Sequence, residues 1–467
     1  MKNKILIFTL IFLSCSRSGP RTTIKPTESW LGVYLAQEKI GYSVSKTQII
    51  PNGYQFVSRA KMSLKMMGQE SEINSNFTCT TDTSLVLKSF DMDFVSQGRS
   101  FRAQGKRVNS KLEVIIKSGG ETKTMAIEVP EKLYPAAIIG NIVAYQGLTP
   151  GKRYEFKIYE PTVMNVVDAQ VVIEKKEKIQ VKNREYEAWK MNISMLGLTS
   201  TTWVDSTGET IKEESPPGIV MIQETPQEAL AKETSEATLD VLSLFSIRVD
   251  STISDPRKVS YLKIEMKNID TTNLSLSDEA QKVLSINPVV LEVTSEPKPV
   301  QKISLPIKGE SEFLKPSLCI QSDNPKIKEK ALAIIKGSKD GGEAAEKLAS
   351  WVFTNVKKRA TASLPSAVDV LATLEGDCNE HSVLFAALAR AVGIPTKIAV
   401  GVVYLDKAFY YHAWNKVYLG NWISVDPTFG QFPADATHIK LQEGELAEQA
   451  KVLKIVGTVK IDIKEFR

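Results

Sequence analysis

The segment Gly376–Pro395, GDCNEHSVLFAALARAVGIP, is the part of the sequence that decides the fold. Gly376 permits a tight turn, and Asp377 is a residue type that commonly caps a helix. The residues after Cys378 are apolar at helical spacing, and a Gly-Ile-Pro stop follows. The segment therefore predicts a buried helix that begins at Cys378. Its inner face is expected to consist of Val383, Leu384, Ala387, Leu388 and Ala391.

Helices are predicted before this segment and strands after it. This order indicates an α+β domain over residues 322–440. The predicted helices cover residues 324–335 with Asp323 as the cap, residues 343–359, and residues 367–374 with Ser366 as the cap. A buried stripe on the second helix is expected to comprise Ala345, Leu348, Trp351, Val352 and Val356. The predicted strands are Lys397–Tyr404, Tyr410–Tyr418 and Trp422–Val425.

The N-terminal half of the chain has the pattern of β-hairpins. Residues 111–129 form two alternating segments around Ser-Gly-Gly-Glu, and Gly208 supplies the turn of a second hairpin over residues 201–214. The predicted fold is therefore multidomain, with β-rich N-terminal and middle modules followed by the α+β domain. The expected boundaries are 29–225 for the first module, a short helix and connection at 226–237, 238–318 for the second module, and 441–467 for a C-terminal extension with a short strand.

The first fifteen residues are typical of an export signal. Lys2 and Lys4 precede the apolar run Ile5–Leu13, which is too short to span a bilayer, and Ser14-Cys15 follows. The pattern resembles a bacterial lipoprotein signal with Cys15 as the lipid-accepting residue; the alternative is an ordinary cleaved signal with an incidental cysteine. The first interpretation predicts a protein held at the cell-envelope membrane by acyl chains, with residues 16–28 as a tether.

The composition gives no reason to expect a nucleic-acid partner. The pairing of the cysteines stays open. A hydrophobic content of 42% with 24% charged residues is ordinary for a folded protein, and a net charge of +5 spread along the chain gives no indication of nucleic-acid binding. An exported protein folds in an oxidising compartment, so Cys79 and Cys319 could form a disulfide. Two buried free thiols are an equally compatible outcome.

Cys378 is the candidate nucleophile. A helix N-terminus stabilises a thiolate and so lowers the thiol pKa, although the neighbouring Asp377 carboxylate opposes this effect. A base is therefore needed. His381 lies on the same helix and is expected to pack beneath the site, whereas His412 lies on a separate strand and Asp426 ends the next one. His438 is expected to be an ordinary surface or core histidine near the site.

The loop between the two strands tests whether His412 and Asp426 can meet. A two-residue turn at Gly420-Asn421 would place the two side chains on opposite faces of the hairpin. A three-residue loop, Leu419–Asn421, pairs Tyr418 with Trp422 and makes His412 a diagonal neighbour of Asp426 on the same face. We therefore predict the three-residue loop, which allows a thiol–imidazole–carboxylate triad.

Four ordered motifs carry a family resemblance. Gly376-Asp377-Cys378, the helix end LARAVGIP, His412-Ala413-Trp414 and Val425-Asp426-Pro427-Thr428 resemble the core of the bacterial transglutaminase-like superfamily, over roughly residues 325–440. The resemblance implies a papain-like fold, with Cys378, His412 and Asp426 as the triad, and acyl transfer or hydrolysis at amide bonds of proteins or peptides through a thioester. The oxyanion would use the Cys378 N–H and an upstream donor, for which Trp351 and Asn355 are candidates.

Two rival interpretations remain. A metal site at Cys378, His381 and His412 is disfavoured because the histidines are dispersed and no second Cys-x-x-Cys is present, so neither a metal nor a cofactor is expected. The rival of a different class is a non-catalytic envelope scaffold with a relic core. All three triad positions are filled, which favours the cysteine enzyme.

Overall fold

The structure is a computed structural model that describes residues 24–467 with short gaps. The gaps are residues 67, 217, 232–239, 241–243, 245, 300–301, 360–364, 446–447, 450 and 453–457. Cys15, the export signal and most of the tether lie outside the described residues. Within the described part, no helix is long and apolar enough to cross a membrane.

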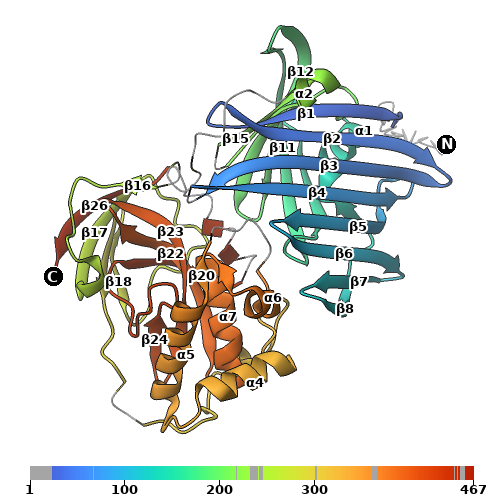
Figure 1. The fold of residues 1–467 in the computed structure, drawn as a ribbon. Coiled ribbons are helices and arrows are strands. Elements are labelled where there is room, and N and C mark those ends of the chain that lie inside the picture. Colours follow the sequence, from blue (N-terminus) through green and yellow to red (C-terminus); the bar gives the residue numbers. More distant parts are fainter. Residues whose placement is uncertain are drawn as a thin grey trace, which may run out of the picture.

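A single curved sheet occupies the N-terminal half. Fifteen described strands follow the order β8 to β1 and then β15 to β9, so that the first strand lies beside the last (Figure 1). Neighbours are antiparallel, except that β9 and β10 are parallel. The strands are β1 Thr27–Leu35, β2 Glu38–Ile50, β3 Gly53–Met66, β4 Gln69–Thr81, β5 Leu87–Ser96, β6 Arg99–Val108, β7 Lys111–Ser118, β8 Glu121–Glu128, β9 Leu133–Pro135, β10 Arg153–Glu160, β11 Asn165–Val181, β12 Arg184–Met195, β13 Leu198–Val204, β14 Thr210–Ser215 and β15 Ile219–Glu224.

Alternation and turn chemistry explain the hairpins. Along β7, Leu112, Val114 and Ile116 are buried while the residues between them are exposed, as expected for a strand with one face on a core. Ser118 pairs with Glu121 across a two-residue turn of glycines with positive φ, which confirms the first predicted hairpin. Gly208 also has a positive φ, of 88°, in the turn between β13 and β14, where the second hairpin was predicted.

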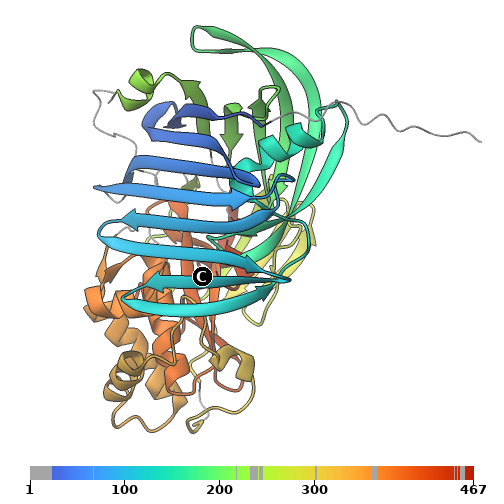
Figure 2. The ribbon, with the colours of Figure 1, turned by 90° about the vertical axis from the view of Figure 1, so that its right-hand side faces the viewer.

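The two halves of the sheet enclose one core. Figure 2 shows β1–β8 as a broad layer, with β10–β13 curving behind it and helix α1 (Ile139–Gln146) between the two. Phe90 on β5 contacts Tyr159 on β10, with ring centroids 5.0 Å apart. Cys79 is buried in this core, and Cys319 is buried in the other main core. Both are free thiols, so the structure contains no Cys79–Cys319 disulfide.

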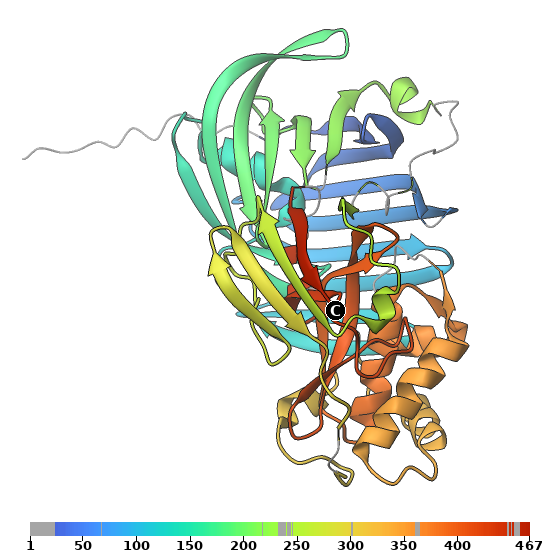
Figure 3. The same ribbon diagram turned by 90° about the vertical axis from the view of Figure 1, so that its left-hand side faces the viewer.

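The middle module is completed by the C-terminus of the chain. Its four-stranded sheet has the order β18-β19-β17-β26, and Figure 3 shows β26 beside the strands of the middle module. The short strand predicted in the C-terminal extension is present as β26, and the structure adds that it pairs with β17 along its length. The strands are β17 Tyr261–Lys267, β18 Gln281–Ile286, β19 Val289–Thr294 and β26 Lys460–Phe466.

Helices and strands after residue 322 form the predicted α+β domain, but its sheet also includes β16, which the expected boundaries assigned to the second module. Helices α4–α7 pack against a sheet of order β16-β23-β22-β25, with β24 paired to β23. The helices are α4 Pro325–Ile334, α5 Gly341–Asn355, α6 Ala367–Thr373 and α7 Cys378–Ala391. The strands are β16 Ile247–Arg248, β22 Thr396–Leu405, β23 Ala408–Tyr418, β24 Trp422–Val425 and β25 His438–Glu443, with a separate short pair β20 Lys357–Lys358 and β21 Glu375–Gly376. The shorter helices are α2 Pro226–Leu230 and the 3₁₀ segments Ala136–Ile138, Pro256–Lys258 and Ser311–Leu314.

Three details differ from the expectations. The cap of α4 is Asn324, one residue after the predicted Asp323, because its side chain accepts the N–H groups of Lys326 and Ile327. Strand β25 pairs with β22 and was not foreseen. Trp351 is only half-buried, although the other members of the predicted α5 stripe are buried.

Helix α7 is the centre of the domain. The prediction of a single inner face is too narrow, because every residue from Glu380 to Ala389 is buried. The sheet covers one side of α7, and α4, α5 and α6 cover the others (Figure 1). A helix enclosed on all sides cannot shift without disturbing several neighbours, so its first residue has a fixed position.

We expect Leu388→Ala in α7 to lower the free energy of unfolding by about 2–5 kcal/mol, because it leaves a cavity at a fully buried side chain. The matched control is Leu332→Ala on α4, whose side chain is 60% exposed and whose loss is expected to change stability by less than about 0.5 kcal/mol. Urea unfolding, monitored by circular dichroism, measures the free energy of unfolding of both variants. Equal effects would contradict the central position of α7.

Candidate active site

Cys378 is the first residue of α7 and is held by a capping box. The Asp377 side chain accepts the Asn379 N–H at 2.8 Å, and the Glu380 side chain accepts the Asp377 N–H at 3.2 Å. A Cβ at Gly376 would lie 2.2 Å from the Glu380 Cβ, so only glycine fits before the cap. The local sequence thus fixes the position of Cys378 at the start of the helix.

Strand β23 packs against the start of α7 at Ala413, the residue after His412. The Ser382 hydroxyl of α7 donates to the Ala413 carbonyl at 3.0 Å, and the Asn415 amide donates back to the Ser382 carbonyl at 3.0 Å. The Ala413 backbone N–H donates a hydrogen bond to Cys378. The sulfur therefore lies beside the strand residue that follows His412.

The predicted loop is confirmed. Tyr418 pairs with Trp422 and Asn415 with Val425, so the loop has three residues and the two-residue alternative is wrong. Asp426 directly follows β24, on the face where His412 lies. The distance from His412 Nε2 to Asp426 Oδ2 is 2.8 Å.

The hydrogen bond to Asp426 sets the tautomer of neutral His412. A carboxylate only accepts, so Nε2 carries the proton and Nδ1 holds the lone pair. The other oxygen of Asp426 accepts the N–H groups of Thr428 at 2.7 Å and Phe429 at 3.1 Å. Burial alone would raise the pKa of Asp426, but His412 and His438 outweigh burial and hold the pKa far below its ordinary value.

Cys378 and His412 are both neutral in this arrangement near pH 7. Burial raises the pKa of the Cys378 thiol, and the Asp377 charge raises it further, so the lowering expected from the helix N-terminus is outweighed. Burial lowers the pKa of His412 despite the attraction of Asp426, and the positive charge of His438 adds to the lowering. The imidazole is therefore free to accept a proton.

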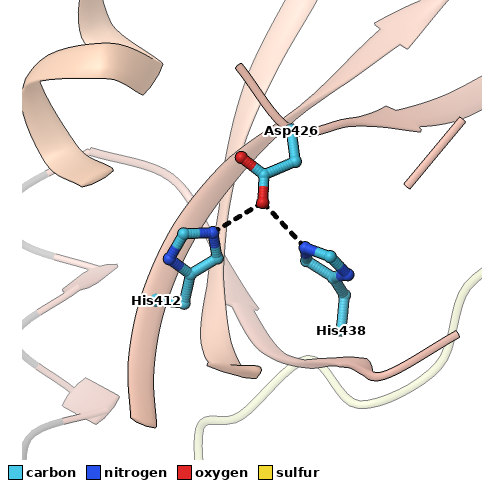
Figure 4. Close-up of side chains that lie close together, drawn as sticks. All are labelled: His412, Asp426 and His438. Atoms are coloured by element: carbon cyan, nitrogen blue, oxygen red, sulfur yellow. Dashed lines mark hydrogen bonds and ion pairs between the residues drawn. The ribbon is translucent and has the colours of Figure 1, made fainter. Parts of the chain in front are cut away.

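His438 binds the same oxygen of Asp426 as His412 (Figure 4). Its Nε2 lies 2.9 Å from Asp426 Oδ2, and its Nδ1 lies 3.0 Å from the Asp435 carbonyl oxygen. Both partners are acceptors, and the Asp435 carboxylate also lies 3.5 Å from Nδ1, so the ring faces two negative charges that favour the imidazolium. Burial would lower its pKa, but the carboxylates of Asp435 and Asp426 raise the pKa to about 9.

Arg257 and aromatic rings close the network. The Arg257 guanidinium forms an ion pair with Asp435 at 3.1 Å and lies 4.5 Å from the centre of the Phe429 ring. Phe429 stacks on His412 with centroids 5.0 Å apart, and Trp414 meets the edge of His438 at 5.2 Å. Two carboxylates thus face two cations around a neutral imidazole.

The structure also shows where the other residues considered from sequence lie. His381 is buried and bonds the carbonyl oxygens of Asp377 at 2.7 Å and Val356 at 3.3 Å, which confirms that it packs beneath the site. The side chain of Asn355 donates to the Trp351 carbonyl, and no contact of either residue with Cys378 occurs in the described part of the chain. The role of His438 was missed, although the spacing Asp435-x-x-His438 offered a signal. Arg257 had no such signal.

One group of residues could hold a metal ion. Atoms of His412, Asp426 and His438 all lie within 4.8 Å of one another, and two imidazoles with one carboxylate are a ligand set for divalent ions. An ion there would have to replace both Nε2 protons. Cys378, His381 and His412, the set considered from sequence, do not form such a group among the described residues.

One family model matches part of the chain. The model described as the transglutaminase-like superfamily matches residues 328–427. No curated protein matches the chain. Similar solved structures include a candidate cysteine protease from Cytophaga hutchinsonii, with 19% identity, a TM-score of 0.31, and coverage of 45% of this chain and 86% of that chain. Another is a β-barrel-like protein of unknown function from Brucella abortus, with 15% identity, a TM-score of 0.34, and coverage of 43% and 96%.

The charge state of His438 is directly measurable because the chain has only three histidines. In histidine-selective NMR, we expect His438 to titrate near pH 9 and the other two below 6.5. Substitution His438→Gln should raise the pKa of His412, because a neighbouring positive charge is lost. A bound divalent ion would instead suppress the titration of both His412 and His438. Three titrations below pH 7 would contradict the imidazolium.

Proposed function

Residues 328–427 belong to the transglutaminase-like superfamily, and we propose that the chain is a cysteine enzyme of papain-like fold acting on amide bonds of proteins or peptides. One observation carries the proposal. The Cys378 thiol accepts the N–H of Ala413, the residue that follows His412, and the Nε2 of His412 is bound to the buried Asp426 carboxylate at 2.8 Å. This juxtaposition supports thiol-based acyl transfer, which needs a thiol, a base and a group that orients the base.

The proposed reaction follows from the neutral resting pair. His412 Nδ1 accepts the thiol proton as the Cys378 sulfur attacks the amide carbon, and Asp426 stabilises the imidazolium that forms. The imidazolium then gives that proton to the leaving nitrogen, so that the C–N bond breaks and a thioester remains. Water or an amine, deprotonated by His412, attacks the thioester and releases the acyl group. The thiol is regenerated without a redox step.

The start of α7 supplies one oxyanion donor. The first N–H groups of a helix have no intrahelical acceptor, and the Asn379 N–H is already bound by Asp377. The Cys378 N–H belongs to this group and is carried by the same residue as the attacking sulfur, and the helix dipole adds a favourable potential for negative charge.

The proposed location is the cell envelope. An export signal over residues 1–15 and a lipid-accepting Cys15 would hold the catalytic domain at a membrane surface, where its substrates would be envelope proteins or peptides. The alternative is a non-catalytic scaffold. Burying three ionisable groups in a satisfied triad costs desolvation energy, which is a poor fit to a relic.

We expect iodoacetamide at neutral pH to label Cys378, whose residue is only half-buried, and to leave Cys79 and Cys319 unmodified, because those two thiols are buried in the two main cores and the reagent cannot reach them. Labelling should fall at least about tenfold in His412→Ala, because the base is lost. Peptide mass spectrometry reads all three sites in one sample. A Cys378 that resists labelling in the folded chain would favour the scaffold.

The acceptor is identified by incubation with a glutamine-containing protein and a fluorescent primary amine. Amine incorporation indicates cross-linking, ammonia release indicates deamidation, and new termini indicate peptide cleavage. Each activity should vanish in Cys378→Ala, which serves as the matched control. Activity that survives in Cys378→Ala would refute the thioester mechanism.

A further inference from the structure

The hairpin ends of the N-terminal sheet reach the helices of the catalytic domain (Figure 1). The turn between β5 and β6 and the turn between β7 and β8 both lie at this edge. Residues of these two hairpins contact α4, α6 and α7 at or near the starts of those helices, as the following contacts show.

Arg99, the first residue of β6, binds both sides of the nucleophile segment. Its guanidinium donates to Glu380 Oε1 at 3.2 Å, to Thr373 Oγ1 at 3.1 Å and to the Glu375 carbonyl oxygen. Thr373 and Glu375 precede Cys378, whereas Glu380 follows it in the first turn of α7. One side chain of the N-terminal sheet thus ties the entry of the helix to its first turn.

The ion pair between Arg99 and Glu380 is buried. The Glu380 side chain is 1% exposed and that of Arg99 is 11% exposed, so the ion pair is shielded from water. A buried carboxylate without a partner is costly. Because Glu380 also closes the capping box, a shift of its carboxylate would disturb the Asp377 N–H and therefore the position of Cys378.

The thiol lies in negative surroundings. From α7 and its cap, Glu380 and Asp377 face it, and Asp426 faces it from the end of β24; all three raise its pKa. From β23, His412 and Tyr411 lie nearby, and Tyr411 itself has a pKa raised by burial and by the Cys378 charge. Arg99 supplies positive charge from the other domain.

Two further contacts hold the β7–β8 hairpin against the starts of α6 and α4. The Ser118 hydroxyl donates to Asp369 in the first turn of α6 at 3.3 Å. A Cβ on Gly119 would lie 2.6 Å from an oxygen of the same carboxylate, so the turn approaches too closely for any other residue. The side chain of Asn324, the cap of α4, donates to Glu121 on β8.

We propose that Arg99 is a positioning residue for Cys378, so that the N-terminal β-sheet is a working part of the active site rather than a separate spacer or binding module. The inference rests on the proposed role of Cys378. It implies that any partner or force that separates the sheet from the helices lowers the reactivity of the thiol.

The test is the rate of Cys378 alkylation by iodoacetamide as a function of pH, measured on the full chain alongside thermal unfolding. Arg99→Met is expected to slow alkylation at pH 7 about tenfold, because it removes the positive charge that lies 3.2 Å from the Glu380 carboxylate. Arg102→Met is the matched control, since Arg102 lies on the same strand and pairs with Asp91 in an exposed contact. It should alkylate at the wild-type rate.

Two further variants separate charge from folding. Arg99→Lys keeps the positive charge, and Arg99→Met with Glu380→Gln removes both charges while an amide can still close the capping box. Both should recover most of the lost rate. An Arg99→Met rate equal to that of Arg102→Met overturns the inference, as does a loss that neither further variant recovers. An unreactive Cys378 in the wild type would instead refute the proposed function.

Discussion

A single carboxylate oxygen, Asp426 Oδ2, receives a proton donor from each of two imidazoles, and the site depends on this shared bond. A fully buried carboxylate remains charged only where several donors compensate for lost water. Here two rings and two backbone N–H groups do so. The three-residue loop after β23, the turn after β24 and the strand β25 all have the geometry that these donors require.

Burial keeps His412 a neutral base, and the shared carboxylate adds to this effect. Asp426 alone would favour the imidazolium, as an adjacent carboxylate does in an exposed pair. His438 takes up part of that negative charge and adds its own positive charge, while Asp435 and Arg257 form a second opposed pair behind it. The balance lets His412 accept a proton during the reaction rather than hold one beforehand.

Local sequence patterns were sufficient to predict the central residues of the site. Glycine, the cap and the apolar spacing predicted the helix start at Cys378, and the parity of a hairpin predicted that His412 lies beside Asp426. The pairing of β26 with β17 and of β25 with β22, and the contacts of Arg99 and Arg257, were not predictable. Each joins segments far apart in the chain, and no local signal specifies such a partner. The thiol pKa was missed for a related reason, since burial depends on the whole fold.

The pairing of β17 with β26 has a consequence for how the molecule reaches its native state. Ile264 lies opposite Ile463, so all of the catalytic helices and strands from α4 to β25 are enclosed in a chain loop that this contact closes. Contacts of such high sequence separation form slowly, because loop-closure entropy is lost before they contribute. The sheet of the middle module therefore gains its fourth strand, β26, only after the whole segment from α4 to β25 has been synthesised.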